Sequence, residues 1–332
     1  MNVPFAAKAA YLPAGEKLIA TNNTIKSRRR LTFTADISAL GEGKLILGHG
    51  YMQSSGSWIE ITPTEILAYS YIGYVDPPLQ NLLKEQNILH GLTITDFVTV
   101  NMDYDPATRL LTVLVFTASG SFKCEIPRWG GSNGDISAHF EGADAENCVL
   151  NWTSDDFGCR IWLIGDSYTG YTHPARWPYY LFRDGYAHLL LAGYAGMNSQ
   201  CAIADFKKYA DKGKPEYMVW CLGMNNSDKE GVLNADYVAA TEEFIAICEA
   251  RGITPILATI PNTPKQNNRQ KNAWVRASGY RYIDFERAVG SHKDVNWYPD
   301  MIYPDHVHPA DNGAAALYAQ VLVDFPEIME RN

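Results

Sequence analysis

A serine, a histidine and an aspartate in this chain have the types and settings that nucleophilic catalysis requires. Ser167 lies in a Gly-Asp-Ser triplet directly after an apolar run at 160–164. Asp305 and His308 lie three residues apart, just before a helical pattern. A serine hydroxyl becomes a good nucleophile when a histidine removes its proton, and a carboxylate can orient that histidine. Ser167, His308 and Asp305 could therefore form a catalytic triad.

Each of these motifs has a simpler interpretation when it is taken alone. Gly-Asp-Ser suits any strand-to-helix turn, where the serine would cap the helix. Asp305 could make a turn, and His308 could be a surface ring ahead of a helix. His306 and His308 could also form a metal pair, but the sequence offers no obvious companion ligands, so we expect no metal.

A serine hydrolase also needs hydrogen-bond donors for the oxyanion that forms when the nucleophile adds to a carbonyl. Asn225 follows an apolar run at 217–222, and its side-chain amide could be one donor. Gly193 and Gly196 follow the preceding run, and a glycine lets a backbone N–H approach a ligand closely. A turn asparagine and a turn glycine are the simpler interpretations of each position in isolation.

Taken together and in this order, the motifs resemble the four sequence blocks of the SGNH/GDSL hydrolases. The blocks are Gly165-Asp166-Ser167, a glycine after the second strand, Gly223-x-Asn225 and Asp305-x-x-His308. They cover essentially all of residues 158–332. The resemblance implies that Ser167 attacks an ester carbonyl, that His308 is the general base and that Asp305 orients it.

The resemblance also implies the oxyanion hole and draws attention to two departures from the family pattern. Its donors would be the Ser167 N–H, the Asn225 side chain and the N–H of Gly196, with Gly193 as the alternative glycine. Tyr168 replaces the leucine of the GDSL motif, which leaves the mechanism intact. Asn226 stands where many members have aspartate, so a contact behind the oxyanion residue is expected to differ.

The elements that must position these residues begin near residue 156. Residues 156–332 alternate short apolar strands with helical periods, which predicts an α/β fold with a flavodoxin-like, doubly wound parallel sheet. Such folds bind ligands at the carboxyl ends of their strands. We expect strands at 160–164, 188–191, 217–222, 255–260 and 280–283, a helix from an Asn234 cap to Arg251, and a last helix at 311–323.

Residues 1–155 alternate apolar and polar positions with period two, which predicts an all-β sandwich domain. It resembles, loosely, the jelly-roll or concanavalin-like sandwiches that accompany carbohydrate enzymes. We expect strands at 31–37, 44–47, 58–61, 65–71, 98–104, 110–117, 136–140 and 148–152, and one helix at 79–89.

Composition excludes several classes of function. The 28 Lys and Arg residues are outnumbered by 37 Asp and Glu residues, and a net charge of −9 repels a phosphate backbone, so we expect no nucleic-acid partner. The sequence has no G-x-G-x-x-G after a strand and no P-loop, so we expect no cofactor. No apolar run approaches the ~20 residues of a membrane span. The oligomeric state is not indicated.

The cysteines and the N-terminus bear on the compartment. Cys148 and Cys159 could pair, although six unpaired thiols are the favoured interpretation. Residues 1–17 lack the charged start and long apolar stretch of a secretory signal. We therefore expect a cytoplasmic protein, or a secreted one whose signal has been removed.

We expect an esterase that removes acetyl groups from a carbohydrate. The alternatives are a glycan-binding protein with an inactive hydrolase-like domain and an acyltransferase using the same triad; a lipase is disfavoured because no long apolar lid is evident. Aromatic residues after the nucleophile could form a stacking floor for a sugar, or could pack onto the sheet. They are Tyr168, Tyr171, Trp177, Tyr179 and Tyr180, with His173 among them as a loop residue.

Overall fold

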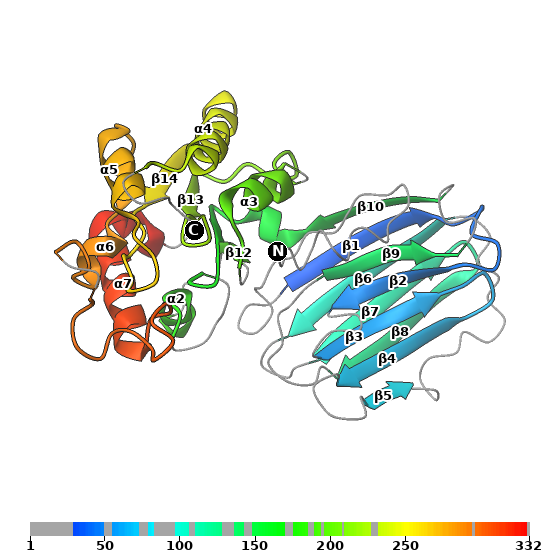
Figure 1. Ribbon diagram of the computed structural model, residues 1–332. Helices are drawn as coiled ribbons and strands as arrows, with labels where there is room; N and C mark the ends of the chain where they lie inside the picture. The colour runs from blue at the N-terminus through cyan, green and yellow to red at the C-terminus, as the bar shows by residue number, and fades with distance from the viewer. Residues whose placement is uncertain are drawn as a thin grey trace. The chain divides into compact units, whose positions relative to one another are not determined.

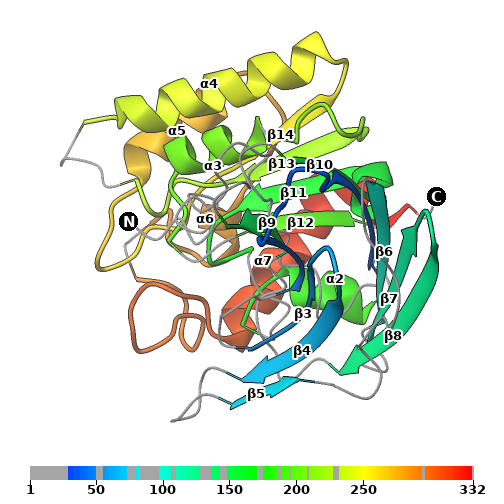
Figure 2. The ribbon, with the colours of Figure 1, turned by 90° about the vertical axis from the view of Figure 1, so that its right-hand side faces the viewer.

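The computed structural model describes residues 29–49, 55–72, 79–82, 97–105, 110–127, 136–142, 148–169, 175–184, 189–193, 196–207, 209–226, 232–293 and 296–330 (Figures 1 and 2). The chain divides into two compact units, and the boundary between them lies between Phe157 and Gly158. The first unit is built of strands, and the second alternates strands with helices.

A five-stranded parallel sheet forms the centre of the second unit, in the order β12-β11-β13-β14-β15. Its strands are β11 (Ile161–Gly165), β12 (Leu189–Gly193), β13 (Tyr217–Cys221), β14 (Thr254–Ala258) and β15 (Tyr282–Ile283). Every residue of β11 and β12 is buried, as a sheet covered on both faces requires. The predicted doubly wound α/β fold is therefore confirmed, and each strand ends within two residues of its expected position.

Helices cover both faces of this sheet, with α3 and α4 on one face and α2 and α7 on the other (Figures 1 and 2). The helices are α2 (Pro178–Arg183), α3 (Ser199–Phe206), α4 (Ala235–Ala250), α5 (Arg269–Ala277), α6 (Phe285–Ala288) and α7 (Asp311–Asp324). The short 3₁₀ helix η4 (Asp155–Gly158) spans the boundary between the two units in the chain. A second one, η5 (Pro326–Met329), follows α7.

Helix α4 shows how the local sequence sets these elements. The Asn234 side chain accepts a hydrogen bond from the Tyr237 N–H at 2.8 Å, which caps the first turn. Gly252 ends the helix with a φ of 65°, a left-handed conformation that glycine adopts readily. Phe244 stacks on Trp220 of β13 with 4.6 Å between ring centroids, so the helix packs directly on the sheet.

The first unit contains two five-stranded antiparallel sheets, in the orders β10-β1-β6-β7-β8 and β5-β4-β3-β2-β9. The strands are β1 (Arg29–Asp36), β2 (Lys44–His49), β3 (Ser55–Ile61), β4 (Ile66–Ile72), β5 (Leu79–Leu82), β6 (Phe97–Asp105), β7 (Leu110–Thr117), β8 (Gly120–Pro127), β9 (Ile136–Glu141) and β10 (Val149–Ser154). The inward residues of β1 are the alternate positions Leu31, Phe33 and Ala35, all buried. This is the predicted all-β sandwich.

The helix expected at 79–89 is wrong where it can be compared. Residues 79–82 form β5, which pairs antiparallel with β4 at the edge of its sheet, from Tyr69 opposite Leu82 to Ile72 opposite Leu79. The backbone hydrogen bonds of these residues are made with a neighbouring strand, and the local sequence does not reveal such a partner. Residues 83–89 lie outside the described part of the chain.

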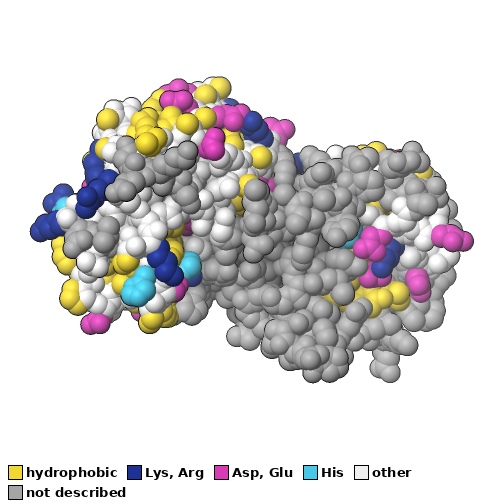
Figure 3. All heavy atoms as spheres, viewed as in Figure 1, with side chains coloured by type: hydrophobic (Ala, Val, Ile, Leu, Met, Phe, Trp, Pro, Cys, Tyr) yellow, Lys and Arg dark blue, Asp and Glu magenta, His cyan; other side chains and the backbone are white. Residues whose placement is uncertain are grey.

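All six cysteines lie among the described residues, and none is joined in a disulfide. Cys124, Cys148, Cys221 and Cys248 are buried. Within the described ranges no helix has both the length and the apolar character needed to span a bilayer. Acidic and basic side chains are interspersed over the described surface of the face shown in Figure 3.

Candidate active site

Ser167 lies just beyond the carboxyl end of β11, in the turn that follows this strand. The turn is closed by a bond from the Thr169 N–H to the Asp166 carbonyl at 3.0 Å. A Cβ at Gly165 would come within 2.4 Å of the Thr169 hydroxyl oxygen, so this tight turn needs a glycine there. Ser167 itself is buried, with 5% of its surface exposed.

One continuous chain of hydrogen bonds joins Ser167, His308 and Asp305. The Ser167 Oγ lies 2.8 Å from the His308 Nε2, and the His308 Nδ1 lies 2.7 Å from the Asp305 Oδ2. A carboxylate only accepts, so the Nδ1 carries a proton and the Nε2 is left to accept from the serine hydroxyl. The structure thus brings together the three side chains that the sequence predicts as a triad.

Backbone donors hold the Asp305 carboxylate in its charged form. Its Oδ1 accepts from the N–H groups of Val307 and His308, at 2.9 and 3.0 Å. Partial burial raises the Asp305 pKa, but these bonds and the His308 ring outweigh that effect and lower the pKa to about 2. His306 is exposed, with a φ of 57°, and takes no part in these bonds.

The loop that carries the histidine is fixed by Tyr168, the residue after the nucleophile. The buried Tyr168 hydroxyl donates to the Val307 carbonyl, and its ring centroid lies 6.0 Å from that of His308. The loop is also closed on itself, because the Tyr303 N–H donates to the His308 carbonyl at 2.9 Å. Sequence reasoning treated Tyr168 as a neutral replacement and missed this contact.

The expected oxyanion residues lie at the ends of β12 and β13. The Asn225 side-chain amide donates to the Met197 carbonyl at 2.9 Å, which ties it to the segment that begins at Gly196. Gly196 has a φ of 76° and is exposed, whereas Gly193 lies within the β12 ladder opposite Gly165. The choice of Gly196 over Gly193 as the oxyanion glycine stays a prediction.

Asn226, which stands where many family members have aspartate, makes hydrogen bonds that an aspartate could not all make. Its Oδ1 accepts from the Ser199 N–H at 3.0 Å, while its Nδ2 donates to the Ser199 Oγ at 2.9 Å and to the Gln200 Oε1 at 3.0 Å. An amide can accept and donate in this way, but an ionised carboxylate can only accept. Asn226 thus joins the turn after β13 to the start of α3.

Asp166 links the nucleophile turn to the turn after β13. Its carboxyl accepts from the backbone N–H groups of Tyr168, at 3.0 Å, and of Met224. It is buried beside a cavity of about 20 Å³ lined mainly by apolar side chains. Burial raises the Asp166 pKa to about 7, although those N–H donors and the charge of Arg176 act in the opposite direction.

Of the two interpretations of the aromatic residues after the nucleophile, packing describes the contacts of Trp177, Tyr179 and Tyr180. Trp177 is fully buried against Phe285, with 5.7 Å between ring centroids. Tyr180 stacks on Tyr318 at 5.7 Å, and Tyr179 meets Tyr180 edge-on. Tyr171 and His173 lie outside the described residues.

Neither histidine of the Asp305–His308 loop belongs to a metal cluster. Within the described ranges no group of three or more His, Cys, Asp or Glu side chains is arranged to hold an ion.

Comparison with known proteins gives a family match for the second unit. Residues 163–316 match the model of the GDSL-like Lipase/Acylhydrolase family. No curated protein matches the chain. Similar solved structures include a GDSL-like lipase from Bacteroides thetaiotaomicron, at 17% identity over 51% of this chain and 89% of that chain, with a TM-score of 0.41. An acetylxylan esterase from Geobacillus stearothermophilus is 18% identical over 52% of this chain and 95% of that chain, with a TM-score of 0.38.

Proposed function

Because residues 163–316 belong to the GDSL-like lipase/acylhydrolase family, we propose that this protein is a serine ester hydrolase that forms its acyl-enzyme on Ser167. The observation that carries the proposal is the hydrogen-bonded chain from the Ser167 Oγ through His308 to Asp305, with links of 2.8 and 2.7 Å. Such a chain supplies a nucleophile, a base and a group that orients the base.

The first half-reaction transfers the acyl group to the enzyme. His308 Nε2 takes the Ser167 proton as the Oγ adds to the ester carbonyl, and the carbonyl oxygen becomes negatively charged. The Asn225 amide, together with the N–H groups of Ser167 and Gly196, stabilises that oxyanion. Asp305, ionised at all pH values well above 2, stabilises the imidazolium. His308 then gives its proton to the departing alcohol oxygen as the C–O bond breaks.

The second half-reaction regenerates the serine. His308 removes a proton from water, which adds to the acyl carbonyl, and the carboxylic acid leaves as Ser167 recovers its proton. An alcohol in place of water would turn the same site into an acyltransferase, so the acceptor decides between the two activities.

The finer proposal is that the natural substrate is an acetylated carbohydrate, with residues 156–332 as the catalytic domain and residues 1–155 as an accessory domain. What supports it is the two antiparallel sheets of the first unit, whose sandwich resembles those that accompany carbohydrate enzymes. Because one fold can carry several functions, the test of this proposal is the substrate itself.

The first experiment measures hydrolysis of p-nitrophenyl acetate and of longer-chain p-nitrophenyl esters. We expect Ser167→Ala to lose at least 10³-fold in kcat, because removing a triad nucleophile costs about 10⁴ to 10⁶. His306→Asn is the control, since this exposed neighbour takes no part in the triad and asparagine tolerates its positive φ. Equal activity in Ser167→Ala and the native protein would contradict the proposal.

A second experiment addresses the carbohydrate. Acetate release from acetylated oligosaccharides is compared with release from p-nitrophenyl acetate, and binding of the deacetylated glycans is measured alongside. Ser167-dependent release from the sugars supports deacetylation. Glycan binding by a protein that is inert on every ester would favour a binding protein with an inactive hydrolase-like domain.

A further inference from the structure

The peptide group between Gly223 and Met224 is bound at both ends by ionisable side chains. Its carbonyl accepts from the Lys271 Nζ at 2.9 Å, and its N–H donates to the buried Asp166 carboxyl. The Lys271 Nζ also donates to the Asn226 carbonyl. Asn225 lies between these contacts, so the turn formed by residues 223–226, here named the oxyanion turn, is held on both sides of the proposed oxyanion donor.

Lys271 is an unusual residue to find in this position. Its side chain is 0% exposed, and lysine is rarely buried because removing an ammonium from water is costly. The carbonyls of the oxyanion turn and the Tyr237 ring, whose centroid is 5.9 Å from the Nζ, offset part of that cost. A methionine would fill much of the same space but could not donate to these carbonyls.

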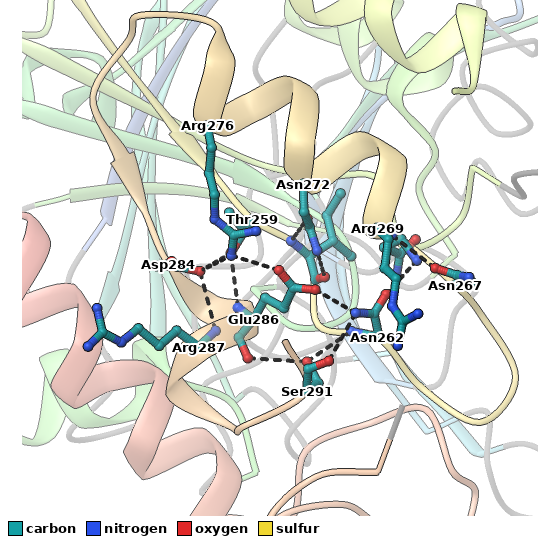
Figure 4. A network of polar contacts seen from close by, with 12 residues as sticks. Thr259, Asn262, Asn267, Arg269, Asn272, Arg276, Asp284, Glu286, Arg287 and Ser291 are labelled. Atoms are coloured by element: carbon teal, nitrogen blue, oxygen red, sulfur yellow. Dashed lines mark hydrogen bonds and ion pairs between the residues drawn. The ribbon is translucent and has the colours of Figure 1, made fainter. Parts of the chain in front are cut away.

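Helix α5, which carries Lys271, is fixed to the end of β14 by a buried polar network (Figure 4). Asn272 donates to the Ile260 carbonyl and accepts from the Ile260 N–H, each at 2.7 Å. In the same network Asn262 donates to both Glu286 and the Ser291 carbonyl. Lys271 therefore reaches the oxyanion turn from a rigid base.

The oxyanion turn has a conformation that its own sequence does not enforce. Gly223 has a φ of 124°, and a glycine there can adopt many others at little cost. Within the turn, the Asn226 N–H donates to the Gly223 carbonyl at 3.2 Å, the same oxygen that accepts from Lys271. To this internal bond are added contacts from outside the turn, from Lys271 to both carbonyls and from the Gln266 side chain to the Asn226 carbonyl at 3.1 Å.

We propose that Lys271 is a positioning residue for ester hydrolysis: its ammonium holds the Gly223 and Asn226 carbonyls and thereby aims the Asn225 amide at the oxyanion. This inference rests on the proposed function. Charge-assisted hydrogen bonds are about twice as strong as neutral ones, and a donor fixed before the reaction begins needs no reorganisation during it.

A double-mutant cycle tests this role. On p-nitrophenyl acetate we expect Lys271→Met to lower kcat by roughly 10- to 100-fold with a smaller change in KM, since losing one oxyanion donor outright costs about 10² to 10³ in kcat. Lys271→Gln, which keeps a neutral donor, should recover part of the loss. In an Asn225→Ala background the same Lys271→Met change should cost less than about threefold, because residues that act as a unit are not additive.

The matched control is Lys265→Met, which removes the same charge from an exposed position that precedes α5. Two results would overturn the proposal: a Lys271→Met enzyme within twofold of native kcat, or a loss that is just as large without the Asn225 amide. The second result would show that Lys271 acts by supporting the fold in general.

Hydrogen exchange separates this inference from the proposed function. If Lys271 holds the oxyanion turn, amide exchange in a peptide covering residues 222–226 should be at least tenfold faster in Lys271→Met, with peptides from β11 unchanged. A native protein inert on esters would end the proposed function, and unchanged exchange at the turn would end the Lys271 proposal, whatever the activity.

Discussion

At the scale of the residue, the proposed mechanism depends on the Asp305 carboxylate acting only as a hydrogen-bond acceptor. The carboxylate accepts two backbone N–H groups on Oδ1 and the His308 ring on Oδ2. This arrangement uses both oxygens as acceptors, and it leaves the proton of the imidazole on Nδ1.

Asp305→Asn should therefore disable the base while keeping the loop intact. The asparagine oxygen can still accept from the backbone, but its NH₂ would face the Nδ1 and drive the ring proton to Nε2. We expect kcat/KM on p-nitrophenyl acetate to fall by on the order of 10³ to 10⁴. Asp300→Asn, an exposed aspartate of the same region that also has a positive φ, is the control and should remain active.

Tyr168→Phe should weaken catalysis mildly, because it removes only the hydroxyl that donates to the Val307 carbonyl. A hydrogen bond of this kind contributes about 1 kcal/mol, so we expect roughly a fivefold loss of kcat. Tyr180→Phe removes a similar bond, to the Asp311 carbonyl at 3.0 Å, at the first residue of α7 rather than in the segment between Asp305 and His308. Equal losses in the two variants would contradict a specific role for Tyr168.

Asp166 should make the stability of the protein depend on pH. Burial raises its pKa from 3.8 to about 7, so the folded protein keeps this proton where the unfolded chain has lost it. The contribution to stability is complete below about pH 4 and is lost as the pH rises through 7. Because each pKa unit corresponds to about 1.4 kcal/mol, the loss over this range is on the order of 4 kcal/mol.

The measurement is the free energy of unfolding by denaturant between pH 4 and 8, in the native protein and in Asp166→Asn. The variant lacks the titrating group, so its curve should be flatter over this range, whatever its absolute stability. Parallel curves would show that the carboxyl is not titrating in this way.

At the scale of the element, glycine decides where the turns after the strands can go. A Cβ on Gly223 would meet the Ile260 Cδ1 at 2.4 Å and the Tyr237 Cε2 at 2.9 Å, on a backbone with a φ of 124°. Any side chain at position 223 would therefore suffer both backbone strain and crowding.

Gly223→Ala should lower stability by about 2 kcal/mol or more and abolish most esterase activity. Gly279→Ala is a matched control, because its φ is 81° but no atom lies within 4 Å of the added Cβ. It should cost only the backbone strain, about 1 kcal/mol, and leave kcat unchanged. Denaturant unfolding and kcat separate the two; equal effects would exclude crowding as the cause.

Also at this scale, sequence patterns predict the elements better than the contacts between them. Continuous apolar runs located β11 to β14 because a sheet covered on both faces needs them. The β5 edge strand was missed because strand pairing is not visible in a local pattern. Lys271 lies one helical turn before buried Val275, so periodicity places it on the inward face of α5, but a lysine is normally assigned to solvent.

At the scale of the whole molecule, every side chain of the proposed mechanism belongs to the unit that follows Phe157. The triad, the oxyanion residues and Lys271 span residues 167 to 308. The first unit thus contributes none of the groups named in the chemistry.

Residues 158–332 produced alone should therefore hydrolyse p-nitrophenyl acetate with a kcat within about threefold of the whole chain. A soluble, folded fragment without activity would show that the first unit is needed for the chemistry itself. If the first unit binds glycan, the fragment should lose efficiency on acetylated oligosaccharides while keeping it on the small ester.

The proposed nucleophile and its base lie 141 residues apart in the chain, so a ribosome makes Ser167 early in this unit and His308 late. A nascent chain that has reached residue 300 already contains Ser167 and Asn225, but the base and its carboxylate have not yet been synthesised. Under the proposed mechanism, we expect hydrolytic activity only after residues 305–308 have folded against Ser167. If Ser167 and His308 act as proposed, a nascent chain that already carries the nucleophile would stay inactive until its base has been made.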